Sequence, residues 1–164
     1  MKHITPCLWF DDNAEEAARF YTSLFPNSKI KHISHYGEAA AKASGRPVGS
    51  VLTVLFDLNG QEFMALNGGP LFKFSESVSF MVMCDDQAEI DRCWNALCGP
   101  GSGGEESQCG WLKDRFGLSW QIVPRAFMDM MQDKDPRKVE RLMQAMLGMT
   151  KFDIAALRRA FDAG

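Results

Sequence analysis

The residues best suited to metal chemistry are His32 and His35, which have His-x-x-His spacing. On a helix this spacing brings both imidazoles to one face, where they could hold a divalent ion such as zinc. The surrounding stretch SKIKHISHY alternates apolar and polar residues, which is typical of a strand. A strand sends residues three apart to opposite faces, so the pattern favours two separate histidines over a metal site. We interpret His3 as a surface histidine as well.

Two further patterns suggest chemistry that their contexts do not support. Gly99, Gly101 and Gly104 match the Gly-x-Gly-x-x-Gly spacing of dinucleotide loops, but such a loop follows a strand and opens a helix. Here the glycines follow a helical segment and lead into an extended one, so a flexible loop is predicted. Cys7 would need a histidine to activate it as a nucleophile, and none is placed to do so, which favours a structural thiol.

Composition excludes several classes of protein. The five cysteines are odd in number and never spaced Cys-x-x-Cys, so neither a disulfide framework nor a zinc knuckle is predicted. The net charge of -3 comes without a basic stripe, which argues against nucleic acid as a partner. No apolar run approaches membrane-spanning length, and no signal-peptide core precedes Pro6. We expect a cytoplasmic protein of a single domain, residues 1–164, without a membrane partner.

The motif Asp-Asp-x-Ala-Glu occurs twice, with the second copy 74 residues after the first. Each copy has the spacing of a capping box, Asp12 with Glu15 and Asp86 with Glu89, in which side chains bind the first free N–H groups of a helix. A capped helix start explains either copy alone. The shared context of a strand-like run before the motif and an amphipathic helix after it indicates an internal repeat.

The predicted elements fall into two similar series. In the first module, residues 2–68, a strand and a helix precede three extended segments, the last two joined by an Asn59-Gly60 hairpin signal. The segment GEAAAKASGRP fits a loop better than a core element. In the second module, residues 77–124, the middle is unclear, but GLSWQIVP predicts a closing strand. We therefore read two βαβββ modules.

A helical extension, residues 125–164, follows the modules. Asp135 is the expected N-cap of a helix that ends at Gly148 and carries a methionine-rich apolar stripe. Thr150 with Asp153 is expected to cap a last helix. The stripe is interpreted as a packing face, and the alternative is an adaptable surface that binds a partner.

The segments ITPCLWFDDNAEEAARFYTSLFPNS, GWLKDRFGLSWQIVP and DPRKVERLMQAMLGMTKFDIAALRRA carry a family resemblance. They look like the PhnB-like branch of the vicinal oxygen chelate superfamily, often labelled a 3-demethylubiquinone-9 3-methyltransferase domain. The resemblance implies an α+β glyoxalase/bleomycin-resistance-type fold of two βαβββ modules around a cleft, and commonly a homodimer. We do not transfer the methyltransferase label, because no Gly-rich loop for S-adenosylmethionine follows a first parallel strand.

The resemblance also implies where a metal would bind. Metal-dependent members carry His, Glu or Gln on the first and last strand of each module, and these positions fall here on Thr5, Met64, Ser79 and Gln121. Only Gln121 is a credible ligand, and Glu62 would become one only through a register shift. Three poor donors of four do not hold a divalent ion. No metal and no cofactor are therefore predicted.

Strand alternation predicts which side chains line the cleft, since neighbouring residues point to opposite faces. The lining set is apolar and aromatic with a few hydrogen-bonding groups, as in many small-molecule sites. Its candidates are Thr5, Cys7, Trp9, Met64, Ser79, Met81 and Gln121. The alternative is that these side chains simply fill the barrel.

Three functions are compatible with this reading. The first is a metal-free protein that binds a small organic molecule. The second is an enzyme of the glyoxalase or dioxygenase-like superfamily, an isomerase, lyase or transferase, although no cleft carboxylate or histidine suited to it is evident. The third is an interaction module that uses the methionine-rich C-terminal helices.

Overall fold

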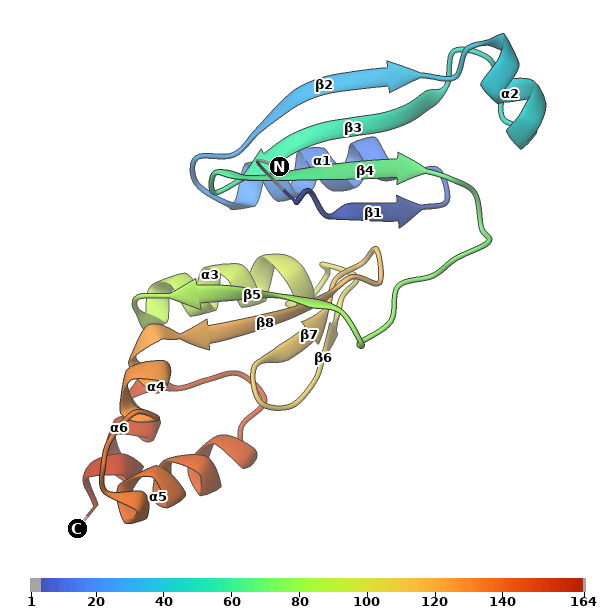
Figure 1. The fold of residues 1–164 in the computed structure, drawn as a ribbon. Coiled ribbons are helices and arrows are strands. Elements are labelled where there is room, and N and C mark those ends of the chain that lie inside the picture. Colours follow the sequence, from blue (N-terminus) through green and yellow to red (C-terminus); the bar gives the residue numbers. More distant parts are fainter. Residues whose placement is uncertain (1–3, 164) are drawn as a thin grey trace. The chain divides into compact units, whose positions relative to one another are not determined.

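The computed structural model describes residues 4–163, so His3 lies outside the described residues. The chain forms two compact units, Met1–Lys73 and Phe74–Gly164, and each contains one four-stranded sheet (Figure 1). The expectation of one domain stays a prediction. Among residues 4–163, no helix is long and apolar enough to cross a bilayer.

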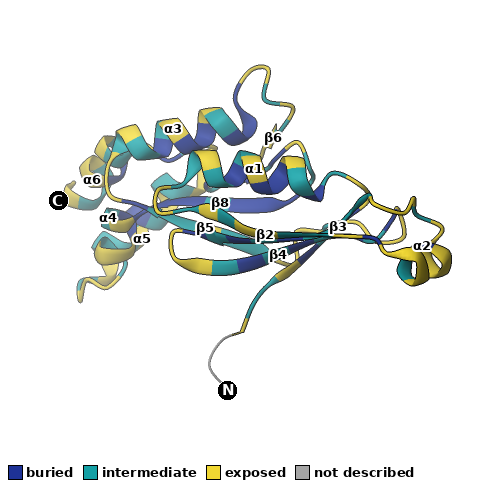
Figure 2. Ribbon diagram, turned by 90° about the horizontal axis from the view of Figure 1, so that it is seen from above, coloured by how far each residue is buried: buried dark blue, intermediate teal, exposed yellow. Residues whose placement is uncertain are grey.

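The first unit contains the predicted βαβββ module with a short helix inserted. Its elements are β1 (Cys7–Phe10), α1 (Ala14–Leu24), β2 (Lys29–His35), α2 (Glu38–Ser44), β3 (Val51–Leu58) and β4 (Gln61–Asn67). The strand order is β1-β4-β3-β2, in which β1 and β4 are parallel and the other neighbours antiparallel. The buried side of α1 (dark blue in Figure 2) carries Ala14, Ala17, Ala18 and Tyr21, as expected of an amphipathic helix.

The hairpin between β3 and β4 forms where the sequence predicts it. Asn59 and Gly60 have φ values of 46° and 84°. Positive φ at both central residues gives a two-residue turn whose twist matches that of the flanking strands. Asparagine and glycine tolerate this conformation better than other residues, so the dipeptide fixes the register of β3 against β4.

The segment predicted as a loop forms α2 instead. Its alanines have the highest helix propensity of any residue, and Gly45 ends the helix in the left-handed conformation at a φ of 72°. Only Ala41 is buried in α2. The prediction was therefore wrong about the local conformation, while most of the segment is exposed, as Figure 2 shows in yellow.

The second unit contains the second module and the C-terminal helices. Its elements are β5 (Ser79–Cys84), α3 (Gln87–Cys98), β6 (Glu105–Glu106), β7 (Trp111–Lys113), β8 (Ser119–Pro124), α4 (Arg125–Met130), α5 (Pro136–Leu147) and α6 (Ile154–Asp162). The strand order is β5-β8-β7-β6, with β5 and β8 parallel. The α+β fold of two βαβββ modules, expected of a glyoxalase/bleomycin-resistance-type fold, is thus confirmed, and each sheet is open.

The registers of the two parallel strand pairs confirm the internal repeat. In the first unit Cys7 lies beside Met64, and in the second Met81 lies beside Gln121. Met81 comes 74 residues after Cys7, and Gln121 comes 57 residues after Met64. The same two offsets relate the neighbouring pairs of the first ladder to those of the second. Equivalent positions in the two modules can therefore be compared directly.

Helix α3 begins as the capping-box motif predicts. The Asp86 carboxylate accepts a hydrogen bond from Glu89 N at 2.9 Å, and the Glu89 carboxylate accepts one from Asp85 N at 2.8 Å. These bonds satisfy N–H groups that the first turn of a helix leaves free.

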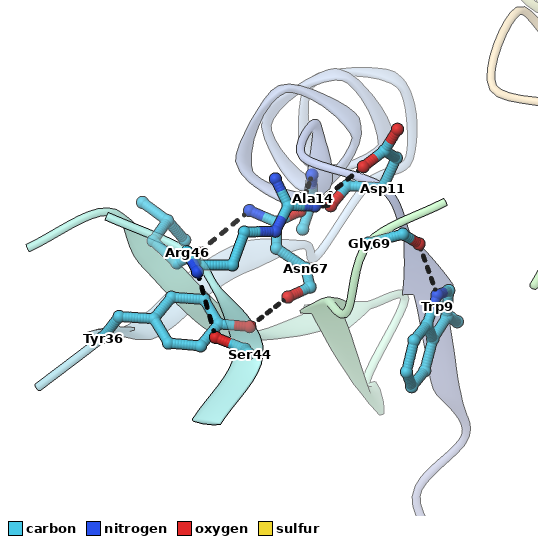
Figure 3. A network of polar contacts seen from close by, with 9 residues as sticks. Trp9, Asp11, Ala14, Tyr36, Ser44, Arg46, Asn67 and Gly69 are labelled. Carbon is cyan, nitrogen blue, oxygen red and sulfur yellow. Dashed lines mark hydrogen bonds and ion pairs between the residues drawn. The ribbon is translucent and has the colours of Figure 1, made fainter. Parts of the chain in front are cut away.

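Helix α1 begins differently, so the predicted pairing of Asp12 with Glu15 was wrong. Its N-cap is Asn13, whose side chain makes no capping bond. The Ala14 N–H instead donates to Oδ1 of Asn67, the last residue of β4, at 2.9 Å (Figure 3). Glu15 pairs with Arg19 one turn further along α1.

Two long side chains, those of Tyr36 and Arg46, make further hydrogen bonds near the start of α1. Tyr36 donates through its hydroxyl to the Asn67 carbonyl at 2.6 Å, and Asn67 donates through its amide to the Val51 carbonyl at 3.1 Å. Arg46 reaches the Asp11 carboxylate at 2.7 Å (Figure 3). Together these contacts fasten the segment around α2 to the turn between β1 and α1.

The C-terminal helices match the predicted caps with one correction. Asp135 caps α5 with Pro136 in its first turn, and Gly148 follows its end, as expected. Helix α6 is capped by Asp153 alone, which accepts from Ala156 N at 2.8 Å, so the predicted pairing with Thr150 was wrong. The interior of this part includes Leu142, Phe152 and Leu157. Helix α4 was not predicted.

Candidate ligand-binding site

Each sheet has one face packed against its long helix and a second face turned away from it, which we call the distal face. In β1, Leu8 and Phe10 are buried, whereas Cys7 is exposed and Trp9 half-buried. The alternation predicted for this strand is therefore observed, and it places Cys7 and Trp9 on the distal face of the first sheet.

The predicted lining residues fall into two sets, one in each unit. The first set consists of Cys7, Trp9 and Met64, with Thr5 just before β1. The second set consists of Ser79, Met81 and Gln121, which share a face by alternation and register.

In the first set, Thr5 belongs to a polar network around Glu62. The Thr5 hydroxyl donates to one Glu62 carboxylate oxygen at 2.9 Å, and the Lys31 ammonium lies 2.7 Å from the other. Asp57 lies 3.5 Å from the same ammonium. The hydrogen bond with Glu62 raises the pKa of Lys31. The Glu62 carboxylate thus serves an ion-pair network, which sequence reasoning did not predict.

Trp9 is held by the chain that follows β4. Its indole N–H donates to the Gly69 carbonyl at 2.8 Å (Figure 3), and its ring meets Phe72 edge-on at 5.0 Å. A Cβ atom at Gly68 would lie 2.2 Å from the Trp9 ring, so only glycine permits this approach. Trp9 is therefore a rigid wall of the distal face.

Cys7 is exposed, but the sheet around its sulfur removes part of the water from it. This burial raises the pKa of the Cys7 thiol. A thiol with a raised pKa is protonated at neutral pH and is a poor nucleophile. The observation agrees with the interpretation of Cys7 as a structural thiol.

The second set combines a flexible apolar side chain with a fixed polar pair. Gln121 donates through its amide to the Ser79 hydroxyl at 2.9 Å. Met81, the register partner of Gln121 and two residues after Ser79 in β5, is 49% exposed. An exposed thioether beside an oriented amide and hydroxyl can contact a small organic molecule through dispersion and hydrogen bonds.

The residues at the predicted metal positions do not fit a divalent ion. Two hydroxyls, a thioether and an amide occupy them, and Gln121 and Thr5 already donate hydrogen bonds to Ser79 and Glu62. Within residues 4–163, no three His, Cys, Asp or Glu side chains are grouped to hold an ion. His32 and His35 lie in a strand, β2, as predicted. Each comes directly after an irregularity in the pairing of β2 with β3.

Two hollows in the second unit were not predicted. One, of about 150 Å³, lies against β6, β7 and β8, and its lining includes Glu76, Glu105, Glu106, Trp111, Lys113 and Ser119. The other, of about 620 Å³, lies between the starts of α3 and α6, beside Asp91, Lys151 and Arg158. The sequence left the region of β6 and β7 unassigned, so the glutamates of the smaller hollow could not be placed.

Comparisons with known proteins agree with the geometry of the modules. Residues 2–123 match the family model described as 3-demethylubiquinone-9 3-methyltransferase. The match ends before α4, so the C-terminal helices lie outside it. A comparison with functionally curated proteins gives no match.

Two solved structures resemble the chain. The first is described as a putative 3-demethylubiquinone-9 3-methyltransferase, PhnB protein, from Bacillus cereus. It is 36% identical, with a TM-score of 0.65, and the similarity covers 75% of this chain and 99% of that one. The second is protein PA1353 from Pseudomonas aeruginosa, at 22% identity and a TM-score of 0.59, covering 76% and 98%. The chain belongs to the 3-demethylubiquinone-9 3-methyltransferase, or PhnB-like, family.

Proposed function

We propose that this protein binds a small organic molecule on the distal face of its second sheet, without a resident metal or cofactor. The observation that carries the proposal is the second set, in which exposed Met81 lies beside the hydrogen-bonded pair of Gln121 and Ser79. Small-molecule sites typically combine apolar walls with a few oriented polar groups. We further propose that it acts in the cytoplasm as a homodimer, with neither nucleic acid nor a membrane as partner.

The chemistry of the predicted metal positions supports binding without metal. A hard or borderline divalent ion prefers carboxylate, imidazole or several oxygen ligands. Met64 offers a soft, weak donor, and Thr5 is committed to Glu62. Gln121 is left as a single amide ligand, which is too few for ordinary affinity.

The family description names a methyltransferase, and we do not propose that activity for this chain. A nucleotide-like cofactor is usually held by a glycine-rich turn between the first parallel strand and its helix. Here β1 and β5 are each followed by two aspartates, at positions 11–12 and 85–86. Carboxylates at both turns do not supply the close backbone approach that such a cofactor needs.

The test is a thermal melting screen of the untagged protein against small organic molecules, with metal salts as a separate arm. A ligand that binds the folded state raises the melting temperature in proportion to its affinity and concentration. For each hit, Met81→Gln is compared with Met128→Gln, since both methionines are exposed and Met128 lies on α4.

The proposal expects Met81→Gln to remove most of the shift and Met128→Gln to keep it. Equal behaviour of the two variants would move the site elsewhere. A stoichiometric metal in the purified protein, lost in Gln121→Ala, would refute binding without metal and favour an enzyme of the superfamily.

A further inference from the structure

The smaller hollow of the second unit has a buried hydroxyl without a partner. Ser119, on β8, is 1% exposed, and no described residue forms a hydrogen bond with its Oγ. A buried hydroxyl left unpaired costs about 1–3 kcal/mol, so native structures rarely keep one without a reason. Ser119 lines the hollow, which makes its hydroxyl available to a molecule bound there.

Three glutamates give this hollow, the acidic pocket, its charge. Glu76 precedes β5, while Glu105 and Glu106 form β6. Lys113 is the cation in its lining, and it pairs with Glu76. The hydrogen bond from Lys113 holds the pKa of Glu76 below its ordinary value. Three carboxylates and one ammonium leave the lining with two negative charges.

Two tryptophans lie at the pocket, one bound to a glutamate and the other in the lining. The Trp94 indole N–H, on α3, donates to the Glu106 carboxylate at 2.8 Å and fixes its position. Trp111, on β7, lines the pocket itself. An aromatic ring beside fixed carboxylates attracts an organic cation through its π face. Glu105 lies opposite Lys113 in the ladder of β6 and β7, at the pocket's edge.

We propose that the acidic pocket binds the primary ammonium group of a small organic molecule, with the Ser119 hydroxyl accepting one of its N–H bonds. Glu105 supplies the opposite charge, and Trp111 forms the wall against the carbon chain. Glu106, the next residue of β6, is held on the α3 side of the sheet by its bond with Trp94. A bare divalent ion fits less well, because within residues 4–163 no three acidic side chains are grouped to hold one ion. In the sheet, Ser119 lies beside Ser79 and Trp111 beside Gln121, so the pocket adjoins the set of Ser79, Met81 and Gln121. The inference does not rest on the proposed function, and comparing Glu105→Gln with Met81→Gln separates binding at the two places.

The size of the pocket limits the ligand. Its volume of about 150 Å³ is similar to that of an engineered apolar cavity that holds one benzene molecule. It therefore accepts an aminoalcohol or a short alkylamine, or the terminal ammonium of a longer molecule, but not a whole aromatic cofactor.

The experiment is an NMR titration of the full-length ¹⁵N-labelled protein with ethanolamine at constant ionic strength. The indole N–H signals of Trp111 and Trp94 are the reporters, because one ring lines the pocket and the other binds Glu106. Ethylene glycol serves as the neutral probe of the same shape. Tetramethylammonium carries the charge without N–H donors, and calcium chloride tests a metal ion. The proposal expects saturable shifts with ethanolamine and none with ethylene glycol.

Three variants locate the binding. Glu105→Gln removes one charge from the pocket and is expected to weaken ethanolamine binding about tenfold, since charge-assisted hydrogen bonds are the strong ones. Ser119→Ala puts a smaller residue at this position and removes an unpaired polar atom, so the variant should fold at least as well. It should weaken ethanolamine binding about threefold, as expected for the loss of a single neutral hydrogen bond. Glu140→Gln makes the same charge change on α5, outside the pocket lining, and should leave binding within about twofold.

Some results would overturn the proposal. These are the absence of a saturable shift, equal affinity for tetramethylammonium, calcium binding that displaces ethanolamine, or ethanolamine binding that survives both Glu105→Gln and Ser119→Ala.

Discussion

The two modules share one backbone plan but start their long helices in different ways. In the first, Asn67 at the end of β4 accepts a hydrogen bond from the first residue of α1, some 53 positions earlier in the chain. The equivalent position in the second module is Pro124, beside Cys84 as Asn67 is beside Phe10. Proline has no side-chain acceptor, and there Asp86 caps α3 locally. The fold thus requires a satisfied helix start but does not dictate which residue satisfies it.

The turns before the last strand of each module also differ in how they are stabilised. Asn59 and Gly60 make a two-residue turn between β3 and β4. Between β7 and β8 the chain needs more residues, and the buried Asp114 carboxylate accepts from Phe116 N at 2.8 Å, Leu118 N at 3.1 Å and the Trp120 indole at 2.8 Å. Backbone preference sets the first turn, whereas one side chain sets the second.

The largest expected effect is at Asp114. Asp114→Ala leaves two backbone N–H groups and the buried Trp120 indole without this acceptor, and it should lower the free energy of unfolding by about 3–4 kcal/mol. In the first module, Asn59→Ala should cost only about 1 kcal/mol, the usual penalty for left-handed backbone at a residue other than glycine. Urea unfolding of both variants measures the difference, and similar losses would contradict the contrast between the two turns.

A smaller contrast is expected between the two helix caps. Asn67→Ala should cost about 2–3 kcal/mol, since Asn67 is buried and its amide binds both Ala14 N and Val51 O. Asp86→Ala should cost about 1 kcal/mol, the usual value for an exposed N-cap. Hydrogen exchange of the α1 and α3 amides measures each helix separately.

The variant Asn67→Asp is the control for this pair. It keeps the oxygen that accepts from Ala14 N but loses the donor to Val51 O. Exchange in the first turn of α1 should therefore stay closer to that of the unchanged protein than in Asn67→Ala. If Asn67→Ala protects α1 as well as the unchanged protein does, Asn67 is not its cap.

Much of this architecture follows from local sequence pattern. Alternation predicted the two faces of β1, and the motif at Asp86 predicted a real capping box, because both depend only on near neighbours. The motif at Asp12 failed, because the acceptor that replaced it, Asn67, comes from a strand that becomes adjacent only after folding. The pairing of Thr5 with Glu62 was hidden for the same reason.

The two candidate sites differ in the same way, since one follows from local pattern and the other depends on contacts made only in the folded chain. Strand period and register were enough to group Ser79, Met81 and Gln121 on one face. The acidic pocket was not predictable, because it depends on β6 and β7, which are two and three residues long and carry too little periodicity to be recognised. The unpaired state of Ser119 is a property of its surroundings, which no residue pattern records.

The smallest expected effect is an acid-sensitive ion pair in the second unit. Lys151, just before α6, lies 2.6 Å from the Asp91 carboxylate on α3, and this hydrogen bond lowers the pKa of Asp91 from its ordinary value of 3.8. A carboxyl whose pKa is lower in the folded state adds stability above its unfolded pKa, and loses it as the pH falls through the folded pKa. Both side chains are more than one-third exposed, so the pair contributes at most about 1 kcal/mol.

Asp91→Asn should therefore lower the free energy of unfolding slightly at pH 7. The difference from the unchanged protein should shrink below pH 3.8 and vanish once the pH has fallen through the lower pKa of folded Asp91. Asp85→Asn is the matched control, since its pair with Arg125 is more exposed, at 70% and 58%. Urea unfolding at pH 7, 4 and 3 compares the two variants. A difference for Asp91→Asn that persists unchanged at pH 3 would mean that packing of the side chain, and not its charge, joins α3 to the segment before α6.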